Sequence, residues 1–363
     1  MEFNFITWAD IHWDELGAKC VTIEDTESVE RAIFNRAKKM KCDFTLFAGD
    51  RYLKREPKDE VKVKADRVMY DLVHKGKIPH FHLIGNHDWT DNSRRWHTAE
   101  SLKWMNNVVI MDEAKTYGLD NVRVHALPAD FQFDINNYEL DSDCLNLFVF
   151  HDAVRGSFMN EERTMKFDSG IDLSEIDIPQ FDFIIAGDIH IRQKFNLKNT
   201  HGGYLGSAVQ RTRADSNVAR GWTEMKATRE PSRWMFSVNF VPTKNLFTRL
   251  SMPVDPSTEF NKLSFSEEVF SDQFVEVKLV GLKEDVDRIA DDPGWKKLHK
   301  KFLPRKIEVL RAYETQQSDV VVDLTSSTGV MDDLDLYLDS KFSSLGNLSK
   351  ESVMDALENL RSN

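Results

Sequence analysis

Side chains that can bind metals or transfer protons recur at the ends of apolar runs in this sequence. They are Asp10, His12, Asp50, Asn86, His87, Asp88, His151, Asp188 and His190. Imidazoles and carboxylates bind divalent cations, and the carbonyl of an asparagine is a further oxygen ligand. An imidazole next to a carboxylate can also transfer a proton, because the carboxylate fixes its tautomer. The spacing therefore predicts a metal centre with acid–base chemistry.

The apolar runs before these residues are typical of buried strands. They cover residues 3–8, 44–48, 145–150 and 181–186, and a helical stripe begins at Ser28 between the first two runs. Strands that alternate with helices form sheets whose carboxyl ends meet at one edge. Each motif alone could be an ordinary turn with solvated polar groups, but the series favours one shared site.

In chain order the motifs are Asp10-Ile11-His12, Gly49-Asp50, Gly85-Asn86-His87-Asp88, His151 and Gly187-Asp188-Ile189-His190. This series resembles the calcineurin-like metallophosphoesterases. Within that superfamily it is similar to the SbcD family, the nuclease subunit of a DNA double-strand-break repair complex. The resemblance spans residues 10–190, and weaker similarity at 204–211 extends it. It implies an α/β fold, namely a two-sheet α/β sandwich with a small α/β capping domain and a C-terminal helical tail.

The resemblance also implies a site with two divalent cations, for which we expect Mn²⁺, with Mg²⁺ as the alternative. One ion would take Asp10, His12, Asp50 and His190. The other would take Asp50, Asn86, His151 and Asp188. His87 would be the general acid that protonates the departing oxygen, with Asp88 holding its tautomer.

The sequence departs from the SbcD pattern at two positions. Leu53 stands where the family has a histidine near the scissile phosphate, which leaves the balance of exonuclease and endonuclease activity open. Asp188 stands where the family more often has histidine. A carboxylate there favours harder cations such as Mn²⁺ or Mg²⁺.

The sequence pattern predicts four segments. Residues 1–248 form the nuclease domain, 249–315 the capping domain, 316–329 a linker and 330–363 a helical tail. In the capping domain we expect a strand at 274–280, a helix at 283–300 and a strand at 307–311. Candidate contacts to the DNA backbone are Arg51, Lys54, Arg55, Arg211, Arg213, Lys297 and Lys301. A solvated charged surface is the alternative for Arg51, Lys54 and Arg55, and for Lys297 and Lys301.

The expected tail carries apolar residues at helical spacing, which cannot be buried by two short helices alone. They are Leu334, Leu338, Phe342, Leu345, Val353, Leu357 and Leu360. By the resemblance, this segment docks on an SMC-like ATPase of the SbcC type, and the nuclease forms a homodimer. From Asp319 onward the chain has nine acidic and three basic residues, a net charge of −6 that is half of the chain's net charge of −12. The remaining residues therefore repel DNA less than the net charge of the whole chain suggests.

Composition is consistent with a cytoplasmic protein of a bacterial cell or a phage-infected host. The three cysteines are scattered, so a disulfide framework is not expected. No apolar run has the length of about 18 residues that a membrane span needs. We therefore predict a metal-dependent DNA exonuclease or endonuclease of an SbcCD-type repair and recombination complex. The alternatives are a phosphatase or small-nucleotide phosphodiesterase of the same superfamily, or a weakly catalytic regulator of an SMC-like ATPase.

Overall fold

The computed structural model describes residues 1–14, 21–160, 163–212, 215–263, 265, 271–302 and 304–314. All of these residues except Glu314 belong to one compact unit, Met1–Tyr313. The expected linker, tail and tail contacts lie outside the described residues.

The first sheet has six strands, and its middle strands run parallel. In spatial order they are β12 (Trp234–Pro242), β11 (Gly221–Arg229), β1 (Glu2–Trp8), β2 (Phe44–Phe47), β3 (His80–Leu83) and β4 (Val108–Met111). The polar motifs that follow β1, β2 and β3 therefore leave the same edge of this sheet.

The second sheet also has six strands. In spatial order they are β5 (Lys115–Leu119), β6 (Val122–Leu127), β7 (Leu145–His151), β8 (Phe183–Gly187), β10 (Gly202–Tyr204) and β9 (Gln193–Lys194). Strands β7 and β8 are parallel neighbours, with His151 opposite Gly187. The two remaining motifs thus leave the second sheet side by side.

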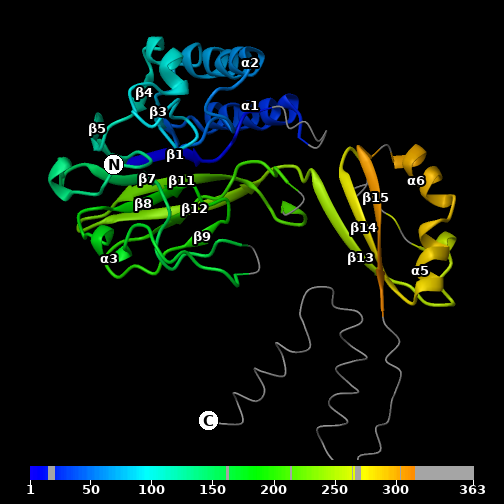
Figure 1. The fold of residues 1–363 in the computed structure, drawn as a ribbon. Helices are drawn as coiled ribbons and strands as arrows, with labels where there is room; N and C mark the ends of the chain where they lie inside the picture. The colour runs from blue at the N-terminus through cyan, green and yellow to red at the C-terminus, as the bar shows by residue number, and fades with distance from the viewer. Residues whose placement is uncertain are drawn as a thin grey trace, which may run out of the picture. The chain divides into compact units, whose positions relative to one another are not determined.

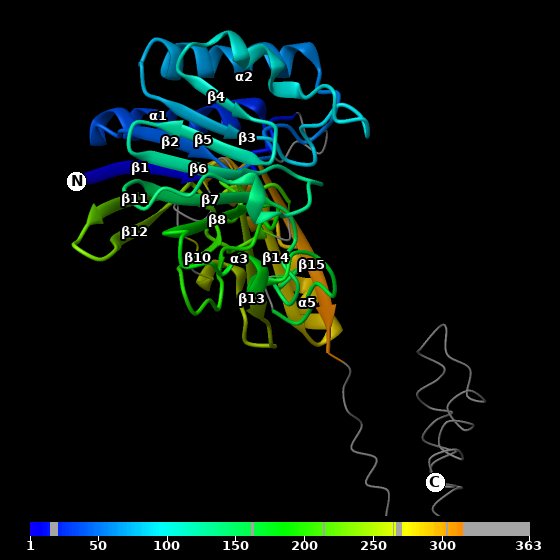
Figure 2. The same cartoon turned by 90° about the vertical axis from the view of Figure 1, so that its left-hand side faces the viewer.

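The two sheets pack face to face, as Figures 1 and 2 show. Phe5 and Leu46 of the first sheet and Leu147 and Ile185 of the second belong to one buried cluster between them. Burying side chains of this size contributes about 1.5–3 kcal/mol each to stability, which holds the two sheets together. The predicted two-sheet α/β fold is confirmed.

Helices α1 (Ile23–Met40) and α2 (Asp59–Met69) cover the outer face of the first sheet (Figure 1). Helix α1 begins at Ile23, five residues before the predicted start. The reason is a capping box, in which Asp25 N–H donates to the Thr22 hydroxyl and Thr22 N–H donates to the Asp25 carboxylate. Shorter helical segments are η1 (Tyr70–His74), η2 (Thr98–Trp104), η3 (Ile135–Asn137), α3 (Leu173–Ile176) and η5 (Phe260–Lys262).

A third, parallel sheet contains β13 (Phe247–Pro253), β14 (Phe274–Gly281) and β15 (Lys306–Tyr313). The connection predicted as one helix at 283–300 is two helices, α5 (Lys283–Ala290) and α6 (Gly294–Phe302). Pro293 lies between them and lacks the N–H that a continuous helix needs. Among the helices that the structure describes, none has the length and apolar character to cross a bilayer.

Candidate metal centre

Four of the predicted ligands have left-handed backbone, which is uncommon for residues other than glycine. The φ angles are 52° for Asp10, 49° for His12, 62° for Asp50 and 86° for Asp188. Each such residue costs roughly 1–3 kcal/mol, so the surrounding strands must impose the conformation. Strain at four candidate ligands indicates that the fold is organised to bring these side chains together.

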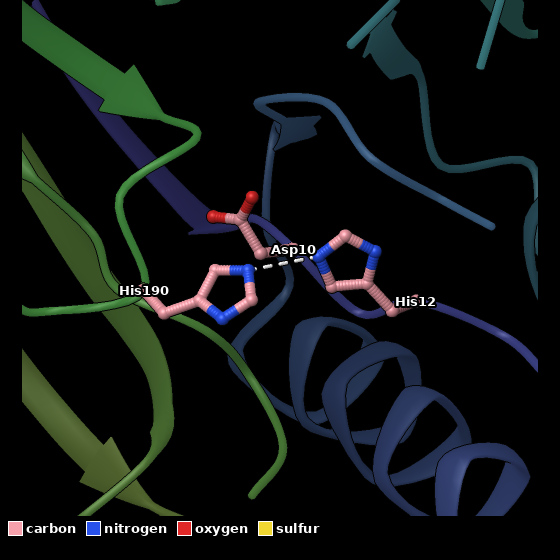
Figure 3. A group of neighbouring side chains, drawn as sticks. All are labelled: Asp10, His12 and His190. Carbon is pink, nitrogen blue, oxygen red and sulfur yellow. Dashed lines mark hydrogen bonds between the residues drawn. The ribbon is translucent and has the colours of Figure 1, made fainter. Parts of the chain in front are cut away.

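The first ligand group joins the two sheets. His12 Nε2 and His190 Nε2 lie 2.9 Å apart, and the Asp10 carboxylate completes the group. Figure 3 shows the His12 and His190 rings facing each other from separate loops, with Asp10 beside them. Asp10 and His12 are buried. Two imidazoles and a carboxylate in this arrangement are a donor set for a divalent cation.

The second ligand group is centred on His151. Its Nε2 atom lies 3.2 Å from Asp50 Oδ1 and 3.2 Å from Asn86 Oδ1. Its Nδ1 atom lies 2.7 Å from the Ala48 carbonyl oxygen, which can only accept a hydrogen bond. The proton is therefore on Nδ1 in the neutral ring, and the lone pair of Nε2 points toward the carboxylate and the amide.

Asp50 lies between the two groups. Its Oδ1 atom contacts His151, whereas its Oδ2 atom lies 3.7 Å from His12 Nε2 and 3.9 Å from His87 Nε2. The side chain is almost completely buried. A carboxylate with one oxygen toward each group is suited to bridge two cations.

His87 is held by a backbone carbonyl. Its Nδ1 atom donates to Leu53 O over 2.6 Å, which directs Nε2 toward Asp50. The structure thus corrects the prediction that Asp88 holds the tautomer of His87. Leu53, which stands where the resemblance implies a histidine, holds the His87 ring through its backbone carbonyl instead.

The Asp88 carboxylate has a different task. It accepts hydrogen bonds from the backbone N–H groups of Gly85, Asp50 and Arg51 at 3.0 Å each. These bonds tie the loop after β3 to the loop after β2, and so they fix Asp50. Burial raises the pKa of Asp88 to about 6, with the nearby Asp50 charge adding to the effect.

The charges of the centre fit divalent cations. Burial raises the pKa of Asp10 well above its ordinary value, and its Oδ2 atom has no hydrogen-bond partner among the described residues. Burial lowers the pKa of His12 to about 3 and that of His190 to about 4, so both rings are neutral and can donate lone pairs. A buried carboxylate oxygen without a donor is costly, and a bound cation would satisfy it.

Asp188 is near the centre but is less enclosed than the other carboxylates. It is half-buried, and its backbone N–H donates to Asp10 Oδ1 over 3.2 Å. Among the described His, Cys, Asp and Glu side chains, the groups whose ligand atoms lie within 4.8 Å of one another leave Asp188 out. Burial nevertheless raises the pKa of Asp188, and the Asp50 charge raises it further. Its role as a ligand stays a prediction.

Glycines of the motifs leave room for the ligands. A Cβ atom on Gly85 would lie 2.2 Å from Asp50 Oδ1, and one on Gly49 would lie 2.2 Å from His151 Nδ1. Neither distance is compatible with a methyl group. The two glycines therefore allow Asp50 and His151 to approach the backbone of the neighbouring loop.

Two of the predicted DNA contacts are buried. Arg51 is 1% exposed, and its Nη1 atom lies 2.6 Å from Glu30 Oε1. Arg211 is 5% exposed, and its Nη1 atom donates to the Thr26 hydroxyl over 3.4 Å. The structure therefore corrects the prediction that Arg51 and Arg211 contact a DNA backbone, because their guanidinium groups lie inside the protein.

The other predicted DNA contacts are solvent-accessible or outside the description. Lys54 Nζ lies 2.8 Å from Asp14 Oδ2, and Arg55 donates to Asn92 over 2.9 Å. Lys297 and Lys301 are exposed on α6. Arg213 lies outside the described residues, as do all the predicted partner-binding residues.

One functional contact was missed by the reasoning from sequence. Arg220 donates through Nη1 to the backbone carbonyl of His190 and through Nη2 to the Asp215 carboxylate. It thereby positions the loop that presents His190. Arg220 stands in no motif, so nothing in the sequence distinguished it from a surface arginine.

A comparison with protein-family models agrees with this geometry. A model of the calcineurin-like phosphoesterase family matches residues 4–192, the segment that contains every ligand described above. None of the curated proteins compared with the chain matches it.

Two solved structures that match this chain have low sequence identity and TM-scores below 0.5. A dimetal phosphatase from Danio rerio is 11% identical, covers 65% of this chain and 95% of its own, and has a TM-score of 0.41. An archaeal phosphodiesterase is 11% identical, covers 66% of this chain and 100% of its own, and has a TM-score of 0.34. The assignment rests on the family model, which spans just over half of the chain. The chain belongs to the calcineurin-like phosphoesterase family of metal-dependent hydrolases.

Proposed function

We propose that this phosphoesterase is a Mn²⁺-dependent DNA nuclease, the catalytic subunit of an SbcCD-type repair and recombination complex. The observation that supports phosphodiester hydrolysis best is the position of Asp50 between two ligand groups, one with His12 and the other with His151. Bound there, a pair of divalent cations supplies Lewis acidity for the phosphate and lowers the pKa of a water molecule. The half-buried Asp188 carboxylate favours a hard cation such as Mn²⁺ or Mg²⁺.

The side chains of the centre have separable roles in this proposal. His12 and His190 bind from one side, and Asn86 and His151 from the other, while Asp50 serves both. His87 has one nitrogen held by Leu53 O and the other directed toward the site, so it can deliver a proton to the departing oxygen.

DNA is the proposed substrate because the third sheet, with its helices α5 and α6, forms an additional α/β layer beside the hydrolase. Its helix α6 carries exposed Lys297 and Lys301, and a charged face of this kind suits a phosphate backbone. Arg305 pairs with Asp25 of α1, which attaches the layer to the hydrolase.

The proposed partners are a second copy of this chain and an SMC-like ATPase bound by the tail at 330–363. Trp96 and Trp104 support the homodimer, because they are 62% and 87% exposed and large apolar side chains at a surface are typical of interfaces. Cys42 and Cys144 are free thiols, which supports the proposed cytoplasmic location.

A metal-dependent nuclease assay tests this function. Linear and circular DNA, bis(p-nitrophenyl) phosphate and p-nitrophenyl phosphate are incubated with the protein in Mn²⁺, with and without the ATPase. We expect hydrolysis of DNA and of the diester. Hydrolysis of the monoester alone would identify a phosphatase instead, and activity on none of them would identify a regulatory subunit.

A further inference from the structure

A groove of about 860 Å³ opens between the two large sheets, at the end where β12 and β9 are the outer strands. Its walls come from β8, β9 and β10 on one side and from β11 and β12 on the other. The groove exists because the sheets are unequal here. β11 and β12 have nine residues each, whereas β10 has three and β9 has two. The second sheet therefore leaves part of the first uncovered.

The walls of the groove are cationic. Four of the lining residues, Arg163, Arg192, Lys194 and Arg233, are basic, and Asp182 is the one carboxylate among them. Asp182 already accepts a hydrogen bond from the Asn146 backbone N–H at 2.8 Å. In a chain with a net charge of −12, this local excess of positive charge is suited to an anionic ligand.

Half-buried aromatic rings lie between these cations. Phe183 of β8 and Phe236 of β12 both line the groove and contact each other, with their ring centroids 4.9 Å apart. The Arg163 guanidinium lies over the Phe158 ring at 5.6 Å, and Phe195 is also half-buried. Aromatic faces interleaved with basic groups bind unstacked bases and phosphates together, as in proteins that hold single strands.

The groove is connected to the metal centre by the loops that carry the ligands. Arg192 follows His190 by two residues, so their Cα atoms are at most about 7 Å apart. On the same wall, the Tyr204 hydroxyl donates to the Asp152 carbonyl over 2.8 Å, next to His151. A strand held in the groove would therefore lie beside both ligand groups.

We propose that this groove binds single-stranded DNA and carries the strand to or from the metal centre. The choice of DNA rests on the proposed function, whereas the choice of a single strand rests on the groove itself. A duplex presents its phosphates but keeps its bases stacked, so its bases could not contact the aromatic rings of the groove. An acidic peptide would match the charge but not the aromatic faces.

The test is binding of a fluorescein-labelled oligothymidylate to the full chain, measured by anisotropy in EDTA so that no hydrolysis occurs. The double variant Lys194→Gln/Arg233→Gln removes two exposed cations from the groove. At 0.1 M salt each phosphate contact contributes about fivefold to the affinity of a single strand, so we expect binding about 25-fold weaker. The slope of log K against the logarithm of the salt concentration should become less negative by about 1.4.

Lys198→Gln is the matched control, because Lys198 is exposed in the connection that follows β9 but does not line the groove. Wild-type affinity in the double variant, or an equal loss in Lys198→Gln, would overturn the proposal. A poly-glutamate peptide that competes as well as the oligonucleotide would also overturn it, by assigning the groove to an acidic peptide.

The same proteins separate this inference from the proposed function. The double variant should hydrolyse bis(p-nitrophenyl) phosphate at the wild-type rate in Mn²⁺, since neither residue contacts the ligand groups. If the wild-type protein cleaves no DNA under any condition, the nuclease proposal fails, and the binding result in EDTA still decides the groove.

Discussion

His12 Nε2 and His190 Nε2 lie 2.9 Å apart, although 178 positions separate the two residues in the chain and their loops follow strands of different sheets. In the absence of a metal, one of the two neutral imidazoles donates an N–H hydrogen bond to the other, because two facing lone pairs would repel each other. Nitrogen ligands of one cation, each at about 2.0–2.1 Å from it, are also separated by about 3 Å. The same separation therefore suits a shared cation, which would replace the proton and hold the two sheets together.

Metal binding should stabilise the fold measurably. A cation present at a hundred times its dissociation constant contributes about 2.7 kcal/mol per site. We expect Mn²⁺ to raise the melting temperature and EDTA to reverse the change. His190→Ala should lose much of this shift, whereas His299→Ala, an exposed histidine of α6, should keep it. An undiminished shift in His190→Ala would contradict the ligand assignment.

The Gly85→Ala substitution should damage the centre without replacing any ligand. The added methyl group would lie 2.2 Å from Asp50 Oδ1 and must displace that carboxylate. We expect loss of Mn²⁺ affinity, measured by calorimetry, and loss of diester hydrolysis. Gly118→Ala on β5 is the control, because its methyl group would meet nothing closer than 3.4 Å. Equal behaviour of the two variants would remove Asp50 from the centre.

His87→Gln should slow hydrolysis by a factor that depends on whether the leaving group needs a proton. General acid catalysis contributes about 10²–10⁴-fold when the departing oxygen needs a proton, as it does in DNA. The p-nitrophenolate ion leaves without one, so hydrolysis of bis(p-nitrophenyl) phosphate should fall much less. Steady-state rates on both substrates give the comparison. A uniform loss on both, together with loss of bound metal, would instead make His87 a ligand beside His12 and Asp50.

Arg51→Met should affect stability and have no direct effect on DNA contacts. It would leave the buried Glu30 carboxylate without its cation, and breaking a buried pair costs about 3–5 kcal/mol. The double variant Arg51→Met/Glu30→Gln should recover part of this loss, because both charges are then absent. Urea unfolding of the wild type, the single and the double variants measures the coupling. A single variant as stable as the wild type would disprove the role of the pair.

Deleting residues 330–363 should abolish binding to the ATPase and leave small-substrate hydrolysis intact. The metal centre lies within the compact unit Met1–Tyr313, so it does not depend on the deleted segment. A melting curve, diester hydrolysis and a pull-down with the ATPase are compared for the two chains. A collapse of the melting temperature would show that the tail belongs to the hydrolase core.

Strand ends could be predicted from the sequence because an apolar run that stops at a polar motif is a local signal. Asp10, His12, Asp50, His151 and His190 were found in this way, and the structure brings them together. Reasoning from sequence assigned Asp88 to His87 because the two are neighbours in the chain. The actual partner, the Leu53 carbonyl, is a backbone atom, and every residue has one.

Burial of single basic residues could not be predicted either. Arg51 and Arg211 stand in polar stretches that are typical of a surface, but tertiary packing encloses both. The burial of Arg51 depends on Glu30 in α1, 21 positions away. No periodicity in the sequence links those two residues. The groove could not be predicted from the sequence for a similar reason. It follows from the unequal lengths of strands that belong to different sheets.

The left-handed backbone at Asp10, His12, Asp50 and Asp188 has a consequence for protein design. A short peptide that copies any one motif would relax to extended or helical backbone, and its side chains would diverge. Transplanting this centre into another scaffold would require the strand ends of both sheets, since they impose the strained conformations. The smallest portable unit of the centre is thus a pair of facing sheets.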